Sequence, residues 1–441
     1  MEMKKQYVII GNGAAGNSAA VTLRKVDSGS DITVVTQEKY DSYSRPLISY
    51  YLKDLITMDK AYLHSHSFYK EQRIKVIKNA IAQKINADKK EIILDNGKII
   101  AYDKLLLATG SVPFIPEIDG VSSRENVFTF LNFADAEKIR KYVKPGYKAI
   151  VIGGGLIGLK AAEGLSKICK KVTVVELADR LLPTILDSQA AGIVGSHIKE
   201  YNINYMTGTS VEKAVDEKHD TGDAHARIDS GNVPKRIGSV IMKNGKKIEC
   251  DLLVIAVGVR ANVTLAADAG IKIGKGILTD RHLQTSEPDI YTAGDCALSN
   301  DILDHQTKIL ALWPNAVEQG EIAAKAMAGG DELFEGSFAM NAIDFFGLHI
   351  VTAGLINPAG DEFQIKISLK KEEKSYRKLV IREGILVGYI LIGDITRAGI
   401  YTSLISEKSP LSELDGDILD EISMLSFDKK DRQTRMNGGE A

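Results

Sequence analysis

Short apolar runs and longer stretches of helical spacing alternate along this chain, and the same alternation occurs twice. Runs of four or five apolar residues bounded by glycine are typical of strands buried in a parallel sheet. Each set, strand then helix then strand, therefore predicts a βαβ unit of about thirty residues. The first set lies at 7–10, 14–25 and 31–35, and the second at 149–152, 156–168 and 171–176.

Each βαβ unit is followed by a polar stretch and then by a buried strand that ends in glycine. Asn96-Gly97 and Asn244-Gly245 are hairpin signals within the polar stretches. The closing strands lie at 102–110 and 251–258. One architectural unit therefore occurs twice in the chain. Beyond about residue 337 the pattern changes to strands followed by short helices, with the strands predicted at 343–355, 363–369 and 375–392.

A glycine-rich loop joins the first strand of each set to its helix. In the pattern G-x-G-x-x-G, one glycine makes the tight turn, one lets the backbone approach a pyrophosphate and one lets helix and strand pack closely. The phosphates then lie at a helix N-terminus. Two such loops predict two bound dinucleotides and electron transfer between them. The predicted contacts are Gly11, Gly13, Ala14, Ala15 and Gly16 in one loop and Gly153, Gly155, Leu156, Ile157 and Gly158 in the other.

A carboxylate ends the last strand of the second set. Glu176 lies eighteen residues after Gly158 and can accept hydrogen bonds from two ribose hydroxyls, whereas it would repel a 2′-phosphate. NADH is therefore favoured over NADPH at this loop. Arg180 either softens that preference or is a solvated surface charge. In the first set Thr36 holds the matching position, and Glu38 is the candidate for an adenosine ribose, with a solvated loop carboxylate as the alternative.

Composition excludes several classes of function. With 441 residues and a net charge of −2, the chain offers no basic stripe for nucleic acid. It contains no apolar run long enough for a membrane span, and its N-terminus enters the first strand without room for a signal peptide. Three cysteines far apart in sequence suggest neither a metal nor an iron–sulfur site, and we expect a reduced, cytoplasmic environment. His64 and His66 are interpreted as a surface pair.

Further segments occur in a familiar order along the chain. Ala108-Thr109-Gly110 ends a buried strand, and the segment 285–295 ends in Gly294-Asp295. Together with the two glycine loops they resemble the flavoproteins related to glutathione reductase, over roughly residues 6–400. That resemblance implies FAD at the first loop, NAD(P)H at the second and an aspartate, here Asp295, on the ribityl chain of FAD. It also implies cofactor contacts at Ile81, Ala108, Thr109, Gly110, Gly294 and Gly258.

The resemblance also implies a division into domains and a fold class. The fold is expected to be α/β, with Rossmann-type FAD and NAD domains like those of glutathione reductase. The FAD domain comprises 1–112 and 262–330, and the NAD domain is inserted as 113–261. An α+β interface domain follows at 331–427, and 428–441 is expected to be a disordered tail. The charged segment 213–237 is predicted to be a mobile surface loop.

The surroundings expected for the flavin indicate the branch of the family. No cysteine precedes Cys169, and His349 is the only histidine after His305, so the thiols and the His-Glu dyad of the disulfide reductases are missing. Cys296 is interpreted as a small buried side chain. The string 45–49 and the segment 312–320 are instead similar to those of NADH-dependent ferredoxin and rubredoxin reductases and apoptosis-inducing factor. They add Arg45, Pro46, Trp313, Asn315 and Ala316 to the predicted FAD contacts.

One residue departs from that branch, because Tyr50 follows Ser49 where ferredoxin reductases carry a lysine. Length and ending also resemble the FAD subunits of phenylglyoxylate dehydrogenase-type complexes and the flavin portion of NADH-dependent nitrite reductases. The sequence thus predicts an FAD-dependent NADH oxidoreductase whose acceptor is a redox protein or an iron–sulfur partner subunit. Alternatives are an NADH oxidase or peroxidase and a flavoprotein with a structural role. Homodimer and hetero-oligomer both stay open.

Overall fold

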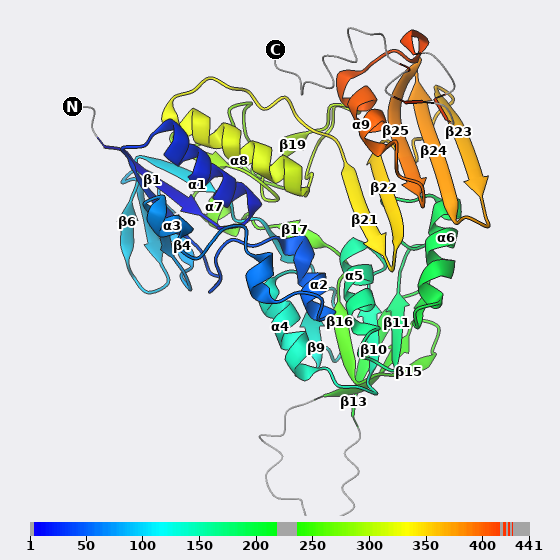
Figure 1. The fold of residues 1–441 in the computed structure, drawn as a ribbon. Helices are drawn as coiled ribbons and strands as arrows, with labels where there is room; N and C mark the ends of the chain where they lie inside the picture. Colours follow the sequence, from blue (N-terminus) through cyan, green and yellow to red (C-terminus); the bar gives the residue numbers. More distant parts are fainter. Residues whose placement is uncertain (1–3, 218–235, 415–417, 420–421, 424–425, 427–441) are drawn as a thin grey trace, which may run out of the picture. The chain divides into compact units, whose positions relative to one another are not determined.

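The computed structural model describes residues 4–217, 236–414, 418–419, 422–423 and 426 (Figure 1). The chain forms two compact units. The first comprises Met1–Phe114, Leu131–Ala136 and Gly258–Phe338, and the second comprises Ile115–Phe130, Glu137–Val257 and Ala339–Ala441. The second βαβ unit and the C-terminal strands thus belong to one compact body. The division into three domains stays a prediction.

A five-stranded parallel sheet forms the centre of the first unit. Its strand order is β18-β7-β1-β2-β3, so segments far apart in sequence become neighbours. The elements of the sheet are β1 (Gln6–Ile10), β2 (Asp31–Val35), β3 (Ile74–Ile77), β7 (Lys104–Leu107) and β18 (Ile290–Thr292). Because the strands are parallel, the carboxyl ends of β1, β7 and β18 meet at one edge of the sheet. Ligands of open α/β sheets bind at that edge.

Two apolar layers cover this sheet. One contains α1 (Ala14–Val26) and α8 (Trp313–Ala328), which lie side by side in Figure 1. The other contains an antiparallel meander and α7 (Thr264–Asp268). The meander strands are β4 (Ala82–Asn86), β5 (Glu91–Leu94) and β6 (Ile99–Ala101). The remaining elements are α2 (Ile48–Leu52), α3 (Phe68–Glu71), α4 (Phe133–Tyr142, which crosses into the second unit) and the strand pairs β8–β17 (Ser111–Pro113, Val259–Ala261) and β19–β20 (Ser299–Asn300, Thr307–Lys308).

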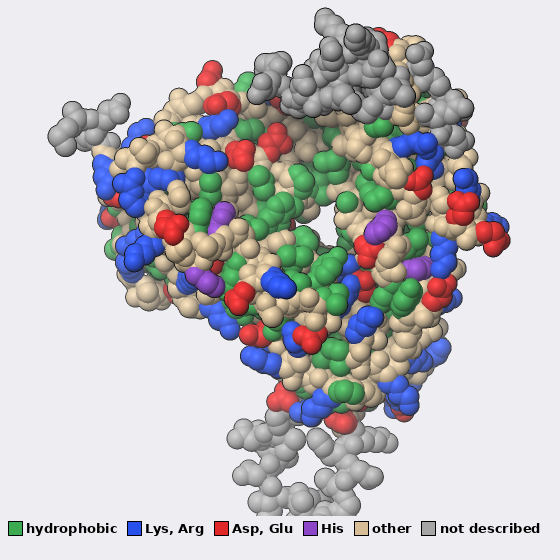
Figure 2. All heavy atoms as spheres, in the orientation of Figure 1, with side chains coloured by type: hydrophobic (Ala, Val, Ile, Leu, Met, Phe, Trp, Pro, Cys, Tyr) green, Lys and Arg blue, Asp and Glu red, His purple; other side chains and the backbone are tan. Residues whose placement is uncertain are grey.

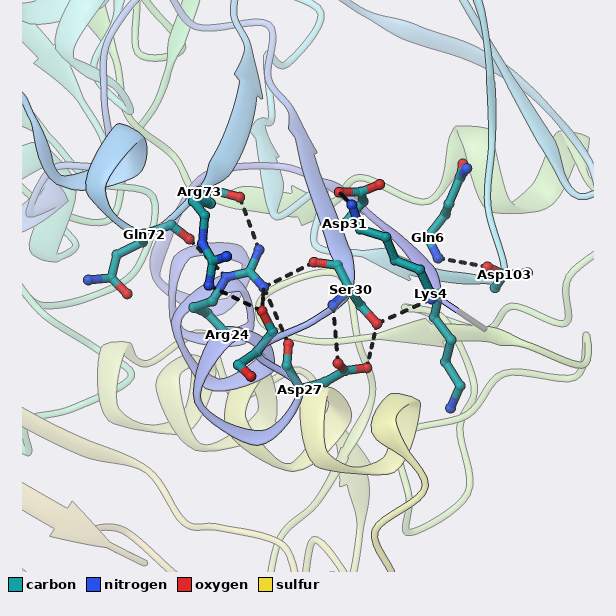
Figure 3. A network of polar contacts seen from close by, with 11 residues as sticks. Lys4, Gln6, Arg24, Asp27, Ser30, Asp31, Gln72, Arg73 and Asp103 are labelled. Carbon is teal, nitrogen blue, oxygen red and sulfur yellow. Dashed lines mark hydrogen bonds and ion pairs between the residues drawn. The ribbon is translucent and has the colours of Figure 1, made fainter. Parts of the chain in front are cut away.

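A buried arginine ties the end of α1 to the strands beside it (Figure 3). Arg24 is 8% exposed, and its guanidinium donates only to backbone carbonyls. Those carbonyls belong to Asp27, Ser28, Ser30, Gln72 and Arg73. Because these residues lie between α1 and β2 or between α3 and β3, one side chain holds the turn before β2 and the turn before β3 together.

Replacing Arg24 by methionine is expected to destabilise the first unit without touching a predicted cofactor contact. Met fills part of the volume but leaves buried carbonyls without donors, each at a cost of about 1–3 kcal/mol. We expect the free energy of unfolding in urea to fall by about 3 kcal/mol, since water reaches some of the carbonyls. Lys25→Met on the exposed neighbouring position is the control and should change it by less than about 0.5 kcal/mol. Equal stabilities of the two variants would contradict this role of Arg24.

A second parallel sheet, of order β12-β11-β10-β16-β9, lies in the second unit. Its strands are β9 (Val127–Thr129), β10 (Lys148–Ile152), β11 (Lys171–Val175), β12 (Ile203–Met206) and β16 (Leu252–Ile255). The helices α5 (Leu156–Leu165) and α6 (Ser188–Lys199) follow β10 and β11. An antiparallel sheet shares an apolar core with this sheet, and its strands are β13 (Val211–Asp216), β14 (Ile237–Met242) and β15 (Lys247–Glu249).

The C-terminal strands form one antiparallel sheet of order β21-β22-β25-β24-β23. The strands are β21 (Met340–Phe345), β22 (Leu348–Gly354), β23 (Phe363–Lys370), β24 (Ser375–Arg382) and β25 (Ile385–Ile392), with α9 (Ala398–Glu407) packed on β25. The expectation of single strands at 343–355 and 375–392 is wrong. Tight turns at Phe346-Gly347 and Glu383-Gly384, all with positive φ, fold each segment into a hairpin.

The predicted α/β fold class is confirmed, and a few element bounds need correction. The helix predicted at 156–168 ends at Leu165, whereas α1 extends to Val26. The start of the predicted loop 213–237 belongs to strand β13, and its residues 218–235 lie outside the described part of the chain. The predicted tail 428–441 lies outside it as well. Among the described helices, none is both long and apolar enough to cross a membrane.

Candidate cofactor sites

The first glycine loop has two positions, Gly11 and Gly16, that leave no room for a side chain. Gly11 follows β1 with φ +110°, and a Cβ there would lie 2.0 Å from the carbonyl oxygen of Ala108 at the end of β7. A Cβ on Gly16 would lie 2.0 Å from the carbonyl oxygen of Gly11, so any side chain would push α1 away from the loop. Gly13 is the N-cap of α1 without a side-chain cap, and a Cβ there would meet no atom within 4 Å. Here the loop is open to a ligand.

The carboxyl ends of β7 and β18 bring further predicted FAD contacts to the same sheet edge. Gly110 and Gly294 both have positive φ. Thr109 donates from its hydroxyl to the carbonyl of Asn262 at 2.7 Å, and Ser111 donates to the Asp295 carboxylate at 3.0 Å. Asp295 is thus held at a strand end with acceptor capacity left over, which suits a polyhydroxyl chain such as ribityl.

The helix α8 lies against this edge through a buried glutamine, Gln319, which belongs to the segment 312–320 but was not among the predicted FAD contacts. Gln319 is fully buried, accepts from the Gly294 amide at 2.7 Å and donates to the Ser299 hydroxyl at 2.6 Å. Asn315 donates to the Leu310 carbonyl, whereas its buried Oδ1 has no partner among the described residues. Trp313, half-buried, begins the helix, and Ala316 is buried one turn on. An unpartnered buried acceptor beside a helix N-terminus fits a hydrogen-bonding cofactor.

Glu38 is embedded in contacts, which argues against the alternative of a solvated loop carboxylate. The Tyr43 hydroxyl donates to it at 2.6 Å, and Arg45 donates at 3.0 Å. Tyr43 also accepts from the Phe133 amide at 3.0 Å, and burial raises the pKa of its phenol. The structure thereby joins two predicted FAD contacts, Glu38 and Arg45, directly, and Tyr43 links Glu38 to an aromatic cluster with Tyr40 and Phe133 that the sequence pattern did not reveal.

Two predicted FAD contacts have less support from the geometry. Pro46 is exposed, and its carbonyl accepts from the Ser49 hydroxyl at 3.2 Å. Ile81 is 49% exposed, and its backbone pairs with Asp95 at the meander. Both stay predictions.

The second glycine loop repeats the first almost atom for atom. Gly153 has φ +108°, and a Cβ there would lie 2.2 Å from the carbonyl oxygen of Ala256. A Cβ on Gly158 would lie 2.0 Å from the carbonyl oxygen of Gly153, whereas one on Gly155, the N-cap of α5, would meet no atom within 4 Å. Leu156 and Ile157 form the first turn of α5 and leave its amides facing the loop. This geometry suits a second pyrophosphate.

Glu176 follows β11 and is hydrogen-bonded to the second glycine loop. Its carboxylate accepts from the Gly154 amide at 2.6 Å and from the Ala178 amide at 2.7 Å. Arg180 is half-buried and donates to the carbonyls of Pro183 and Leu186 and to the Asp179 carboxylate, which argues against a solvated surface charge, whereas its effect on the choice of nucleotide stays a prediction. Gly258 belongs to the first unit, where its carbonyl accepts from the Phe114 amide. Its contact with a nucleotide stays a prediction.

The three cysteines are all buried side chains. Cys296 is fully buried, as predicted, and burial raises the pKa of the Cys169 and Cys250 thiols to about 12. None of the three is an exposed thiol.

The interpretation of His64 and His66 as a surface pair is wrong for His64, which is half-buried and stacks on Phe68 with ring centroids 3.7 Å apart.

Comparison with known protein families decides the class. A family model described as pyridine nucleotide-disulphide oxidoreductase matches residues 5–320. The chain belongs to that family. A second model, described as the rubredoxin NAD+ reductase C-terminal domain, matches residues 340–409, which include the C-terminal antiparallel sheet. Membership implies binding of FAD and a pyridine nucleotide, in agreement with the two glycine loops.

Individual relatives support the predicted branch. The chain is 33% identical to the ferredoxin–NAD(+) reductase component of the 3-phenylpropionate/cinnamic acid dioxygenase of Photorhabdus laumondii, over 73% of this chain and 77% of that protein. It is 28% identical to the epsilon subunit of NADH-dependent phenylglyoxylate dehydrogenase of Aromatoleum evansii, over 93% of each. The structure of an NAD-dependent persulfide reductase from A. fulgidus matches with a TM-score of 0.83 at 27% identity, covering 98% of this chain and 84% of that one.

Other relatives are much longer proteins. The NAD(P)H nitrite reductase of Bacillus subtilis is 32% identical over 93% of this chain but only 48% of its own length. The chain thus spans about half the length of some curated relatives that it matches. The resemblance to NADH-dependent ferredoxin and rubredoxin reductases, predicted from Arg45-Pro46 and the segment 312–320, is confirmed.

Proposed function

We propose that the chain holds FAD at the first glycine loop and NADH at the second, and passes electrons from NADH through FAD to a redox protein or partner subunit. The observation that carries the proposal is the repeated loop geometry. In both loops a glycine without room for a Cβ lies against a neighbouring strand, and a second glycine opens the helix N-terminus. FAD supplies the chemistry when bound, since it accepts a hydride and can release electrons singly.

The first unit would hold FAD through residues that meet at one sheet edge. The amides at the start of α1 would bind the pyrophosphate, Glu38 the adenosine ribose and Asp295 the ribityl chain. The N-terminus of α8, with Trp313 and Asn315, would face the flavin and stabilise negative charge on it. In the second unit the start of α5 would bind the NADH pyrophosphate, and Glu176 the adenosine ribose hydroxyls.

The lack of an accessible thiol among the described residues supports a protein as the electron acceptor. Among the described residues the three cysteines are buried, so no thiol is placed to attack a disulfide or a peroxide. Two relatives work, by their names, with a ferredoxin and as a subunit of a dehydrogenase. We infer an iron–sulfur protein or subunit as the natural acceptor. On the face drawn in Figure 2, basic and acidic side chains lie interspersed.

Steady-state oxidation of NADH by the purified, FAD-loaded chain tests the proposal. We expect rapid turnover with ferricyanide and with a [2Fe–2S] ferredoxin, and slow turnover with O2 or H2O2. Fast oxidation by O2 would instead support the oxidase alternative. Rapid flavin reduction without turnover on any acceptor would support a structural role.

A variant with all three cysteines replaced by alanine is expected to keep its activity. Because none of the thiols is exposed, kcat with ferricyanide should stay within about 3-fold of wild type, while unfolding in urea shifts by about 1 kcal/mol per site through small cavities. The single variant Cys296→Ala tests the cysteine that directly follows the predicted FAD contact Asp295. Comparing its turnover with its stability in urea separates a chemical role from a packing role. A loss of turnover beyond about 100-fold in a folded, yellow variant would restore thiol chemistry to consideration.

A further inference from the structure

A chain of hydrogen bonds ends at the first glycine loop. Asn12, between Gly11 and Gly13, is 8% exposed and accepts from the Tyr69 hydroxyl at 3.0 Å through Oδ1. Tyr69, on α3, accepts in turn from Asn17 Nδ2 at 3.0 Å. Asn17 Oδ1 then accepts from His64 Nε2 at 3.0 Å, and the His64 ring is stacked on Phe68. Both Asn17 and Tyr69 are buried.

One buried polar atom of this relay has no hydrogen-bond partner among the described residues. Tyr69 has a single proton, which it gives to Asn12 Oδ1, so the other half of that amide must find a partner elsewhere. Within the described part of the chain, Asn12 Nδ2 is buried and has none. A buried donor without an acceptor is costly, and native proteins rarely keep one unless a ligand or water completes it. If Asn12 instead donated to the Tyr69 hydroxyl through Nδ2, its Oδ1 would be the atom without a partner. That oxygen would repel a phosphate.

We propose that Asn12 Nδ2 donates a hydrogen bond to the pyrophosphate of bound FAD, and that Tyr69, Asn17 and His64 position its amide for that bond. The inference rests on the proposed function, which places FAD at this loop. The loop offers room at Gly13, where a Cβ would meet no atom within 4 Å, and the amides of α1 begin there. Asn12 thereby adds a side-chain donor to an anion site otherwise built from backbone amides.

Binding of FAD and of ADP to the apoprotein, measured by calorimetry, tests the role of Asn12. ADP carries the same pyrophosphate without the flavin. Asn12→Ala should weaken both ligands about 10- to 100-fold, the usual range for a hydrogen bond to a charged group. Asn12→Asp, which faces the phosphate with a carboxylate, should weaken them by more than about 100-fold. Asn86→Ala on β4 is the matched control and should bind like wild type.

A double-mutant cycle tests the positioning role of Tyr69. Tyr69→Phe should weaken FAD about 3- to 10-fold, because the Asn12 amide loses the bond that orients it. Asn12→Ala/Tyr69→Phe should bind no more weakly than Asn12→Ala, since Tyr69 acts on the ligand only through Asn12. Additive losses would overturn the relay, and wild-type affinity of both Asn12 variants would overturn the contact. Failure of wild type to bind FAD or ADP would instead overturn the proposed function.

Discussion

A Gly158→Ala variant is expected to stay yellow and to lose its reduction by NADH. The new Cβ would lie 2.0 Å from the carbonyl oxygen of Gly153, so α5 must move away from the loop that it completes. A shift of about 1 Å in the pyrophosphate site displaces the nicotinamide and can cost 100-fold in rate. We expect the rate of flavin reduction by subsaturating NADH, followed by anaerobic stopped flow, to fall at least about 100-fold.

The control for this change is Gly192→Ala on the exposed side of α6, where a Cβ would meet no atom within 4 Å. That variant should reduce at the wild-type rate and be slightly more stable, because alanine favours a helix over glycine. Chemical reduction of Gly158→Ala by dithionite should bleach the flavin normally, which separates loss of NADH from loss of FAD. Wild-type reduction by NADH would show that the second loop does not bind it.

Replacing Glu176 by alanine is expected to collapse the preference for NADH. The carboxylate would accept both ribose hydroxyls and repel a 2′-phosphate, and its loss also frees the Gly154 and Ala178 amides that it holds. Hydrogen bonds to a charged acceptor contribute about 1.5–3 kcal/mol each, so the ratio of kcat/KM for NADH to that for NADPH should fall about 100-fold. Most of the fall should come from NADH.

Glu212→Ala, on an exposed position of β13, removes the same charge elsewhere in the second unit and should leave the ratio unchanged. An unchanged ratio in Glu176→Ala would assign the choice of nucleotide to other residues.

The sequence revealed those parts of the site that local geometry dictates. The glycines of both loops could be predicted because a Cβ at Gly11, Gly16 or Gly158 collides with backbone a few residues or one strand away. Glu176 could be predicted because it lies at a fixed distance along a βαβ unit. The hairpin at Phe346-Gly347 was missed because it lacks an Asn-Gly or Asp-Gly signal, and the residues on both sides of the turn, Phe345 and Leu348, are apolar.

Contacts between distant segments explain what sequence reasoning missed. Gln319 holds Gly294, and Tyr43 joins Glu38 to Phe133, through bonds that only the folded chain brings together. His64 looked like a surface residue because its neighbours in sequence are polar. Its partner Asn17 lies on α1, forty-seven residues earlier, and no local sequence pattern predicts a contact over that separation.

The near identity of the two glycine loops bears on how one chain came to serve two cofactors. With φ values of +110° and +108° at Gly11 and Gly153, and the same 2.0 Å approach at Gly16 and Gly158, the two backbones carry no information that distinguishes a flavin nucleotide from a nicotinamide nucleotide. If the halves descend from one duplicated ancestor, the loops are the conserved inheritance. Divergence then lies in the side chains, both around the loops and within them, where Asn12 of the first loop is matched by Gly154 of the second.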